Sequence, residues 1–531
     1  MILRICHLLV VAVVFIFTPP DDSSTSALWG RNGELWTPQS RLPDFSYAGY
    51  HSGNDPIPEV TVKADVKNFG AVGDGQADDS QAFLRAIASV SNGAIFIPAG
   101  RYKINEILKI NKSGVVLRGA GQGATVLYFP RPLLDILGRS TRIFGHNGYW
   151  CWAGGLIWCG PGRDNGVNLA RVVAPALRGD QTLTLSSTTD VRPGAMIRLV
   201  EHDDNGSLGR YLHAGYAEAG SCVMEATAGK FVDFVSKVTQ VSEKTISLER
   251  PLRVDVRLEW RPEVFSHVPA LEEIGIENLT IEFPKSEYRG HTFQEVGYNG
   301  IYFDAVSNSW VRNVTILDAD NGILTAPSEK PFAIGRFCTF QGIRLEVHER
   351  SKALSGHHGI ALESPHDYLV TDFQINTQFV HDLTVDEFAN GNVFSEGKGI
   401  DVNFDHHRAV PFENLFTNID VGSGSRLWRN GGSECAGPNS GARETLWRIQ
   451  ASAPQDFPMY PQLNIIGMTA WPASKSDQTW IEPISPASIE PANLHQAQLS
   501  RRQRGLVWRS MEDMRRSLQK RTGVETRLKE R

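Results

Sequence analysis

The chain has 531 residues, a formal net charge of −6, 41% hydrophobic residues and 21% charged residues. This composition excludes a disordered or fibrous protein, and the length allows one very large domain or two or three ordinary ones. The mild negative charge argues against attraction of the whole surface to nucleic acid or to an anionic glycan. A polyanion would therefore have to meet a local basic patch.

The N-terminal 27 residues have the pattern of a secretory signal peptide. Arg4 is followed by an apolar run over residues 8–17, and residues 25–27 (Thr-Ser-Ala) are small enough for cleavage. The apolar run is too short for a comfortable membrane span. We therefore expect a secreted, extracellular monomer with no membrane or nucleic-acid partner. Residues 28–64 lack a clear period and are expected to form an extended arm over the main domain.

Cysteine and asparagine usage fits an oxidising, secretory environment. Loss of Cys6 with the signal would leave Cys151, Cys159, Cys222, Cys338 and Cys435. Cys151 and Cys159 flank a Trp/Gly-rich loop and could be bridged. Glycosylation sequons stand at Asn111, Asn205, Asn278 and Asn313. The last two lie in strand-like runs, where a structural role is equally expected.

The segment after the arm has the clearest pattern. The run "FGAVGDGQADDSQAFLRAI" starts at Phe69, and its apolar residues predict a short helix beginning at Asp79 or Ser80, either of which could cap it. The runs "GAIFIPAGRYKI" and "VVLRGAGQGATVLYF" follow as strand, turn and strand.

These three runs resemble the opening of the pectin-lyase-like (pectate lyase) superfamily of right-handed parallel β-helices, including the N-terminal cap of polygalacturonase-like enzymes. The resemblance covers about residues 65–130. It implies an all-β coil whose open end is covered by the helix, and a polysaccharide as substrate or partner. It identifies the fold better than the chemistry, because lyases, hydrolases, epimerases and glycan-binding spikes share this opening.

The coil is expected to span residues 65–475, interrupted by a β-rich insert at 140–265 whose strands alternate apolar and polar residues. From about residue 271, short apolar strands recur every two dozen residues, with Gly and Asn at the corners. We expect the asparagines of "ENLT", "RNVT" and "ENLF" to form ladders along the stack. Residues 476–531 are predicted to form a linker and a basic C-terminal helix or tail, which could cap the coil.

The densest polar constellation runs from residue 356 to residue 443. Because residues one coil apart stack on the same face, we expect these groups to converge in one groove. The candidates for catalysis are Lys398, His407, Arg408, Asp405, Asp401 and Asp382. The candidates for substrate binding are Arg426, Arg429, Arg443, His357, His358, Tyr298, Tyr302 and Trp428.

The first hypothesis is β-elimination on an acidic, uronate-containing polysaccharide. This reaction needs a cation on the substrate carboxylate, a base for the adjacent proton and an acid for the leaving oxygen. The guanidinium groups of Arg426, Arg429 and Arg443 suit the carboxylate. Lys398, His407 or Arg408 could be the base and Tyr298 or Tyr302 the acid. For Arg408 an ion pair with Asp405 or Asp401 is equally expected.

The second hypothesis is hydrolysis by two carboxyl groups, for which Asp382, Asp386, Asp401, Asp405 and Glu363 are available. The Asn-Thr-Asp, Gly-Asp-Asp and Arg-Ile-Lys motifs of polygalacturonases are absent, so that family's catalytic assignment is not carried over. A third hypothesis is a non-catalytic, glycan-binding spike with aromatic platforms. The density of charged residues favours an enzyme.

A metal ion is a further option. Calcium could be held by Asp401, Asp405 and Glu396. Zinc is less favoured, because neighbouring histidines on a strand are expected to point to opposite faces, so each His-His doublet would offer one ligand at most.

Overall fold

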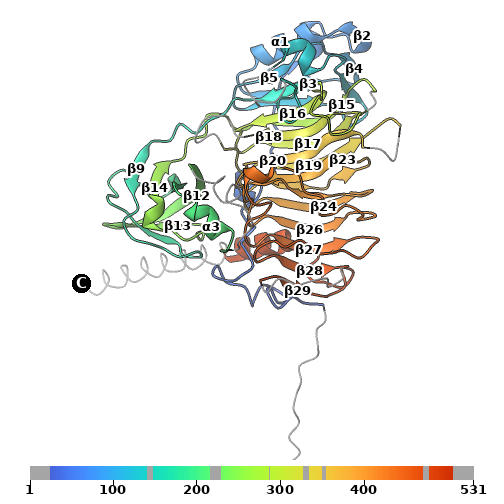
Figure 1. Ribbon diagram of the computed structural model, residues 1–531. Helices are drawn as coiled ribbons and strands as arrows, with labels where there is room; N and C mark the ends of the chain where they lie inside the picture. Colours follow the sequence, from blue (N-terminus) through green and yellow to red (C-terminus); the bar gives the residue numbers. More distant parts are fainter. Residues whose placement is uncertain are drawn as a thin grey trace, which may run out of the picture.

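The computed structural model describes residues 24–139, 148–215, 229–285, 288–326, 334–349, 354–469 and 478–505. Residues 1–23 of the expected signal peptide and the tail beyond 505 lie outside these ranges. The described chain is a column of parallel strands closed at one end by helix α1, with a smaller antiparallel sheet beside it (Figure 1). The predicted right-handed parallel β-helix with a β-rich insert is confirmed.

Two sheets run along the column. The long sheet consists of β1 (Val62–Asp65), β2 (Asp74–Asp78), β3 (Gly93–Ile97), β4 (Gly100–Lys103), β6 (Val115–Gly119), β7 (Thr125–Tyr128), β15 (Gly275–Glu282), β17 (Trp310–Leu317), β19 (Thr339–Glu346), β21 (Leu369–Thr371), β22 (Gln374–Ile375), β24 (Val393–Gly399), β26 (Leu415–Asp420), β27 (Thr445–Gln450), β28 (Asn464–Met468) and β29 (Trp480–Glu482). The short sheet consists of β5 (Leu108–Ile110), β8 (Ile157–Cys159), β16 (Asn299–Asp304), β18 (Asn321–Ala326), β20 (Gly356–Glu363), β23 (Phe379–Asp386) and β25 (Phe404–His406). Their apolar side chains fill the bore between the sheets.

The coils are held in register by repeated corner residues. One residue in each of seven strands of the long sheet adopts a left-handed conformation at an equivalent position: Asn278, Asn313, Gly342, Glu396, Asn418, Arg448 and Gly467. Asn313 donates its amide to Asn278 at 3.0 Å. A second, buried ladder runs from Asn392 to Asn414 and on to Glu444. The predicted asparagine ladders are confirmed at these positions.

Helix α1 (Ser80–Ser89) covers the first coil with the buried faces of Ala82, Phe83, Ala86 and Ile87, as predicted. Its N-cap residue is Asp79, but the Asp79 side chain makes no capping bond to the helix. Its carboxylate instead accepts the backbone N–H groups of Val72 and Gly73 at 2.5 and 3.1 Å. Asp79 therefore orders the preceding glycine-rich loop rather than the helix start.

The N-terminal arm runs along the outer face of the long sheet, as expected. Trp29, Trp36, Leu42 and Phe45 pack with strand residues such as Trp447 in one apolar cluster. The helical segment 494–505 joins the same cluster, and the Leu494 N–H donates to Thr417 Oγ1 at 3.1 Å. The described part of the C-terminal helix thus lies on the side of the coil and does not cap its end. No described helix is long and apolar enough to span a membrane.

The insert is an antiparallel sheet of β9 (Asn168–Arg171), β10 (Thr182–Thr184), β11 (Met196–Asp203), β12 (Lys230–Val241), β13 (Thr245–Leu248) and β14 (Glu263–Ser266), with helix α3 (Ser207–Leu212). It starts later than residue 140, because β8 pairs with β5 and β16 in the coil. Leu208 and Leu212 of α3 pack on Phe388 and Phe412, which lie in the turns that leave the short sheet.

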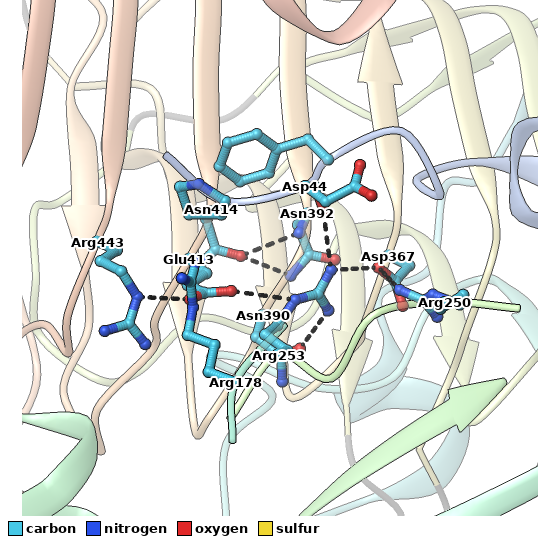
Figure 2. A network of polar contacts seen from close by, with 12 residues as sticks. Asp44, Arg178, Arg250, Arg253, Asp367, Asn390, Asn392, Glu413, Asn414 and Arg443 are labelled. Atoms are coloured by element: carbon cyan, nitrogen blue, oxygen red, sulfur yellow. Dashed lines mark hydrogen bonds and ion pairs between the residues drawn. The ribbon is translucent and has the colours of Figure 1, made fainter. Parts of the chain in front are cut away.

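A buried network of charges ties the insert to the coil. Figure 2 shows the Arg253 guanidinium between Asp367 and Glu413, at 3.0 and 3.4 Å. Glu413 also pairs with Arg178 at 2.9 Å and with Arg443 at 2.6 Å. Because Arg178 and Arg253 belong to the insert segment and the other residues to the coil, these ion pairs fix one unit against the other.

The expected bridge between Cys151 and Cys159 is wrong. Both cysteines are free and buried, as is Cys338. Cys159 lies in the apolar bore, whereas Cys151 lies beside Glu295, which with burial raises the pKa of the Cys151 thiol. Cys435 is disulfide-bonded.

Replacing Glu413 with Gln should destabilise the attachment of the insert. The change leaves the guanidinium groups of Arg178, Arg253 and Arg443 facing a neutral amide, and removing one partner of a buried ion pair costs about 3–5 kcal/mol. The measurement is thermal unfolding together with limited proteolysis of the insert. The control is Asp204→Asn, which breaks the exposed pair with Arg261 and should change little. Equal effects of the two variants would contradict this role.

The same network should make the protein sensitive to acid. Burial alone would raise the pKa of Asp367 and of Glu413, but Arg250 and Arg253 around Asp367, and Arg178, Arg443 and Arg253 around Glu413, outweigh it and lower both. A carboxyl with a lowered pKa stabilises the fold above its unfolded pKa, about 4, and loses that contribution as the pH falls further. The midpoint of thermal unfolding should therefore drop below about pH 4, and less steeply in Glu413→Gln than in the wild type.

Candidate active site

A cluster of histidine rings lies on the short sheet, where three successive coils carry His357 and His358, then His381, then His407. His358 and His381 are paired in register on β20 and β23. The His381 ring centroid lies 4.9 Å from that of His358 and 4.7 Å from that of His407. Because the coils stack in parallel, histidines that are about two dozen residues apart in the sequence lie side by side.

Asp405 is the polar centre of this cluster. It is fully buried, and its Oδ2 lies 2.7 Å from His407 Nδ1 and 3.0 Å from His381 Nδ1. The Gly431 N–H donates to its other oxygen at 2.6 Å, and Thr384 donates to Oδ2 at 3.2 Å. The carboxylate thus forms a hydrogen bond with Nδ1 of His407 and lies at ion-pair distance from Nδ1 of His381.

The charges of the cluster follow from burial and from these contacts. Burial would raise the pKa of Asp405, but His407 and His381 hold it well below its usual value. Burial would lower the pKa of His407, but Asp405 and the nearby carboxyls raise it to about 9. Burial and then the neighbouring imidazoles lower the pKa of His357 and of His358 well below the ordinary value.

Two carboxyl groups lie at the C-terminal ends of two neighbouring strands of the short sheet. Glu363 on β20 is in register with Asp386 on β23. Burial, followed by the charge of Asp386, raises the pKa of Glu363 well above its usual value. Burial also raises the pKa of Asp386 to about 8, although His407 opposes this shift. Both residues are partly accessible, so the site offers Asp386, which keeps a proton near neutral pH, and Glu363, which holds its proton more tightly than an ordinary carboxyl.

The rim of the site contains residues outside the predicted set. His291 is exposed, and its ring centroid lies 4.7 Å from that of His357 and 4.2 Å from that of Phe293, which is 42% exposed. Trp152 contacts Phe293 and His357 from the other side. Burial and then His381 lower the pKa of His291. His291 and Phe293 precede β16 in an irregular segment, so no strand period could have predicted their position.

Several predicted residues have structural partners instead. Arg426 donates to Asp382 and to the carbonyls of Phe379 and Asp401. Asp382 is buried, which raises its pKa to about 6 against the opposing effect of Arg426. Asp401 accepts the N–H and hydroxyl of Ser425. These contacts hold the segment after β26 against β23 and the chain before β25, and the expected carboxylate clamp at Arg426 is already occupied by protein groups.

Other candidates lie away from the histidines. Arg443 belongs to the network of Figure 2. Lys398 is exposed on β24 of the long sheet, in register with Gln374 and Asp420. Tyr298 packs on Phe283, and its hydroxyl donates to the Pro130 carbonyl at 3.3 Å. The structure does not bring these three side chains to the cluster.

The remaining four candidates have different surroundings. Arg429 is exposed, and its charge acts on His291. Arg408 donates to the Gly437 carbonyl at 3.4 Å, and no ion pair joins it to Asp405 or Asp401 among the described residues. Tyr302 packs against Trp158 in an apolar strip of the short sheet that leads toward Thr384. Trp428 packs on Phe404 and Tyr460 against the core.

The two His-His doublets behave differently. The rings of His357 and His358 lie 4.3 Å apart, so the expectation that they point to opposite faces is wrong. His406 instead packs on Phe416 and Tyr460, away from His407, as expected. Among the described residues, metal-capable groups are formed by His291, His357 and His381 and by His381, Asp405 and His407.

The three carboxylates expected to hold calcium do not form such a group. Asp401 is engaged by Ser425, and Glu396 accepts the amides of Asn418 and Asn493 beside the C-terminal helix. Asp405 is held by the histidines.

Comparison with known proteins agrees with the fold. Residues 64–131 match the family model described as rhamnogalacturonase A/epimerase, pectate lyase-like. The chain is 29% identical over 161 residues to mannuronan C5-epimerase AlgE4 of Azotobacter vinelandii, covering 23% of this chain and 28% of that protein. It is 38% identical over 75 residues to alginate lyase 7 of the same organism, covering 12% and 9%.

Among solved structures, the tailspike protein gp49 of Pseudomonas phage LKA1 aligns with a TM-score of 0.40 at 13% identity, covering 76% of this chain and 64% of that one. The chain matches less than a third of the length of either curated relative. Together, the coil, its capping helix and the matched opening define a parallel β-helix protein with a polar site on its short sheet. Residues 64–131 thus match a pectate-lyase-like family model, as the opening motif predicts, at the start of a parallel β-helix.

Replacing Gly431 with Ala should displace the histidines without unfolding the coil. A Cβ atom at this position would overlap with Cε1 of both His381 and His407. We expect changed imidazole resonances of these two residues in NMR spectra and an unchanged circular dichroism spectrum. The control is Gly505→Ala, where no atom lies within 4 Å of the added carbon. Unchanged imidazole resonances in Gly431→Ala would show that the rings are not packed against this glycine.

Proposed function

We propose that this protein is a secreted enzyme that cleaves a uronate-containing polysaccharide by β-elimination. The observation that carries the proposal is a partly exposed histidine, His407, oriented by the buried carboxylate of Asp405 beside the carboxyl pair of Glu363 and Asp386. Elimination at a uronate needs a base for the proton on C5 and an acid for the oxygen leaving C4. An oriented imidazole next to protonated carboxyls supplies both.

The residues take separate roles in this mechanism. Asp405 binds Nδ1 of His407, and Nε2 of the neutral ring accepts the C5 proton, so activity should increase as the pH approaches the raised pKa of His407, about 9. Glu363 or Asp386 donates a proton to the glycosidic oxygen as the C4–O bond breaks, which leaves a double bond between C4 and C5. The exposed guanidinium of Arg429 binds the uronate carboxylate and stabilises the negative charge that develops on it. Phe293 and Trp152 provide apolar surface for a sugar ring.

A second candidate is C5-epimerisation, which begins with the same proton abstraction but returns a proton to the opposite face of C5 without breaking the chain. The similarity to a mannuronan C5-epimerase favours it, as the similarity to an alginate lyase favours elimination. Hydrolysis is less well supported, because Asp382, Asp401 and Asp405 are engaged by protein groups. A purely binding spike would not need the buried Asp405–His407 pair.

The proposed activity can be tested with a panel of acidic and neutral polysaccharides. Elimination produces unsaturated uronates, seen as an increase in ultraviolet absorbance together with new reducing ends. His407→Gln should lower kcat/KM by about 10²–10⁴-fold, the usual contribution of one acid–base group. The matched control is His348→Gln, an exposed histidine paired with Asp318 outside the site, which should retain full activity.

Each outcome decides between the alternatives. Reducing ends without absorbance would overturn elimination in favour of hydrolysis by Glu363 and Asp386. A changed uronate epimer ratio, seen by NMR without new ends, would identify an epimerase. Full activity in His407→Gln would remove His407 from the mechanism.

A further inference from the structure

Three imidazoles of the cluster converge without satisfying one another. His291, His357 and His381 each offer one ring nitrogen, and these three atoms lie within 4.8 Å of one another. His357 and His381 are almost fully buried, whereas His291 is exposed at the rim. Three imidazole nitrogens around a position that opens to solvent form the usual ligand set of a catalytic zinc site.

The Nδ1 atoms of His357 and His381 lie close to oxygen atoms that can orient the two rings as metal ligands. His357 Nδ1 lies 3.0 Å from the Cys151 carbonyl oxygen, and His381 Nδ1 lies 3.0 Å from Asp405 Oδ2. In protein metal sites a ligating histidine usually donates its other ring N–H to a carbonyl or carboxylate, which fixes the tautomer and the ring. A proton on Nδ1 of each ring would leave its Nε2 as a lone-pair donor.

A second observation points to a missing partner. The His381 side chain is 3% exposed, and neither of its ring nitrogens has a hydrogen-bond partner among the described residues. A buried polar atom without a partner is costly, and native structures normally satisfy it with protein, water or an ion.

We propose that His291, His357 and His381 bind one divalent transition-metal ion, with zinc as the best match. Three neutral nitrogen donors without a carboxylate suit zinc, cobalt, nickel or copper and do not suit calcium or magnesium, which prefer oxygen ligands. The fourth position faces the rim, where water or a substrate carboxylate can enter. Metal binding is independent of the proposed function, and only a role in holding the uronate depends on it.

Binding can be measured on the full chain without a substrate. The protein is dialysed against a chelator, then titrated with zinc by calorimetry and with cobalt by visible absorption, and its metal content is determined by mass spectrometry. We expect one ion per chain, ligand-field bands of a nitrogen-bound cobalt ion, and a higher midpoint of thermal unfolding with zinc. Calcium in the same concentration range should neither bind to this site nor displace cobalt.

The decisive variant is His291→Ala, because this exposed side chain can be removed without opening the core. It should weaken zinc binding by at least about 100-fold, since even the loss of an outer-shell partner costs 10–100-fold. The control is His348→Ala, which removes an equally exposed histidine elsewhere. His381→Gln, checked for folding by circular dichroism, should abolish the cobalt bands.

The inference is overturned if the wild-type protein binds no zinc or cobalt, or if both His291→Ala and His381→Gln bind as tightly as the wild type. Such a result would leave the proposed elimination untouched, because the acid–base residues are tested by His407→Gln. Conversely, metal binding without turnover of any polysaccharide would support the site while removing the proposed function.

Discussion

The in-register stacking of parallel coils is the constraint on which the rest of the molecule depends. Each coil places its residues directly above those of the previous coil, so one left-handed corner must be followed by another at the same position. The ladders from Asn278 to Asn313 and from Asn392 to Asn414 fix this register with hydrogen bonds. A slip of one residue would break these ladders and turn apolar side chains out of the bore.

The same constraint assembles the site. His358 and His381 meet because they occupy equivalent positions on β20 and β23, and Thr384 is paired with Asp405 for the same reason. The insert then fixes the turns at one end of the short sheet. Its ion pairs with Asp367 and Glu413 and the packing of α3 on Phe388 hold the chain that leaves Asp386. The site therefore depends on both units, although its polar residues come from the coil.

Much of the fold could be predicted from the sequence, because the capping helix, the glycine-rich opening and the asparagine corners are local patterns. The arm was also predictable from its lack of period. The start of the insert was not, because Ile157–Cys159 is as short and apolar as any strand of a sandwich. The prediction of a disulfide between Cys151 and Cys159 was wrong, because the spacing of two cysteines does not show where their side chains point in an irregular loop.

The site was predictable only in part. The high density of polar residues between 356 and 443 indicated that His357, His358, Asp405 and His407 lie in one region. The structure brings them together because neighbouring coils stack. Charge type alone could not distinguish arginines that face a substrate from those that hold the chain. Arg426 and Arg443 belong to buried ion pairs, whereas Arg429 is exposed at the rim. His291 was missed because it reaches the cluster from a loop before β16, outside the coil repeat.

The arrangement of charge is compatible with the proposed anionic sugar despite the negative charge of the whole chain. One buried carboxylate, Asp405, is shared between two imidazoles, and the other carboxyls, Glu363 and Asp386, have raised pKa values. The local field is therefore set by imidazoles and by Arg429 rather than by the net charge of −6. An anion that enters the rim meets hydrogen-bond donors and a cation, and it does not have to approach an exposed carboxylate pair. The local positive charge that a polyanion requires would thus come from exposed Arg429 and from His407, whose pKa Asp405 raises, and not from the net charge of the chain.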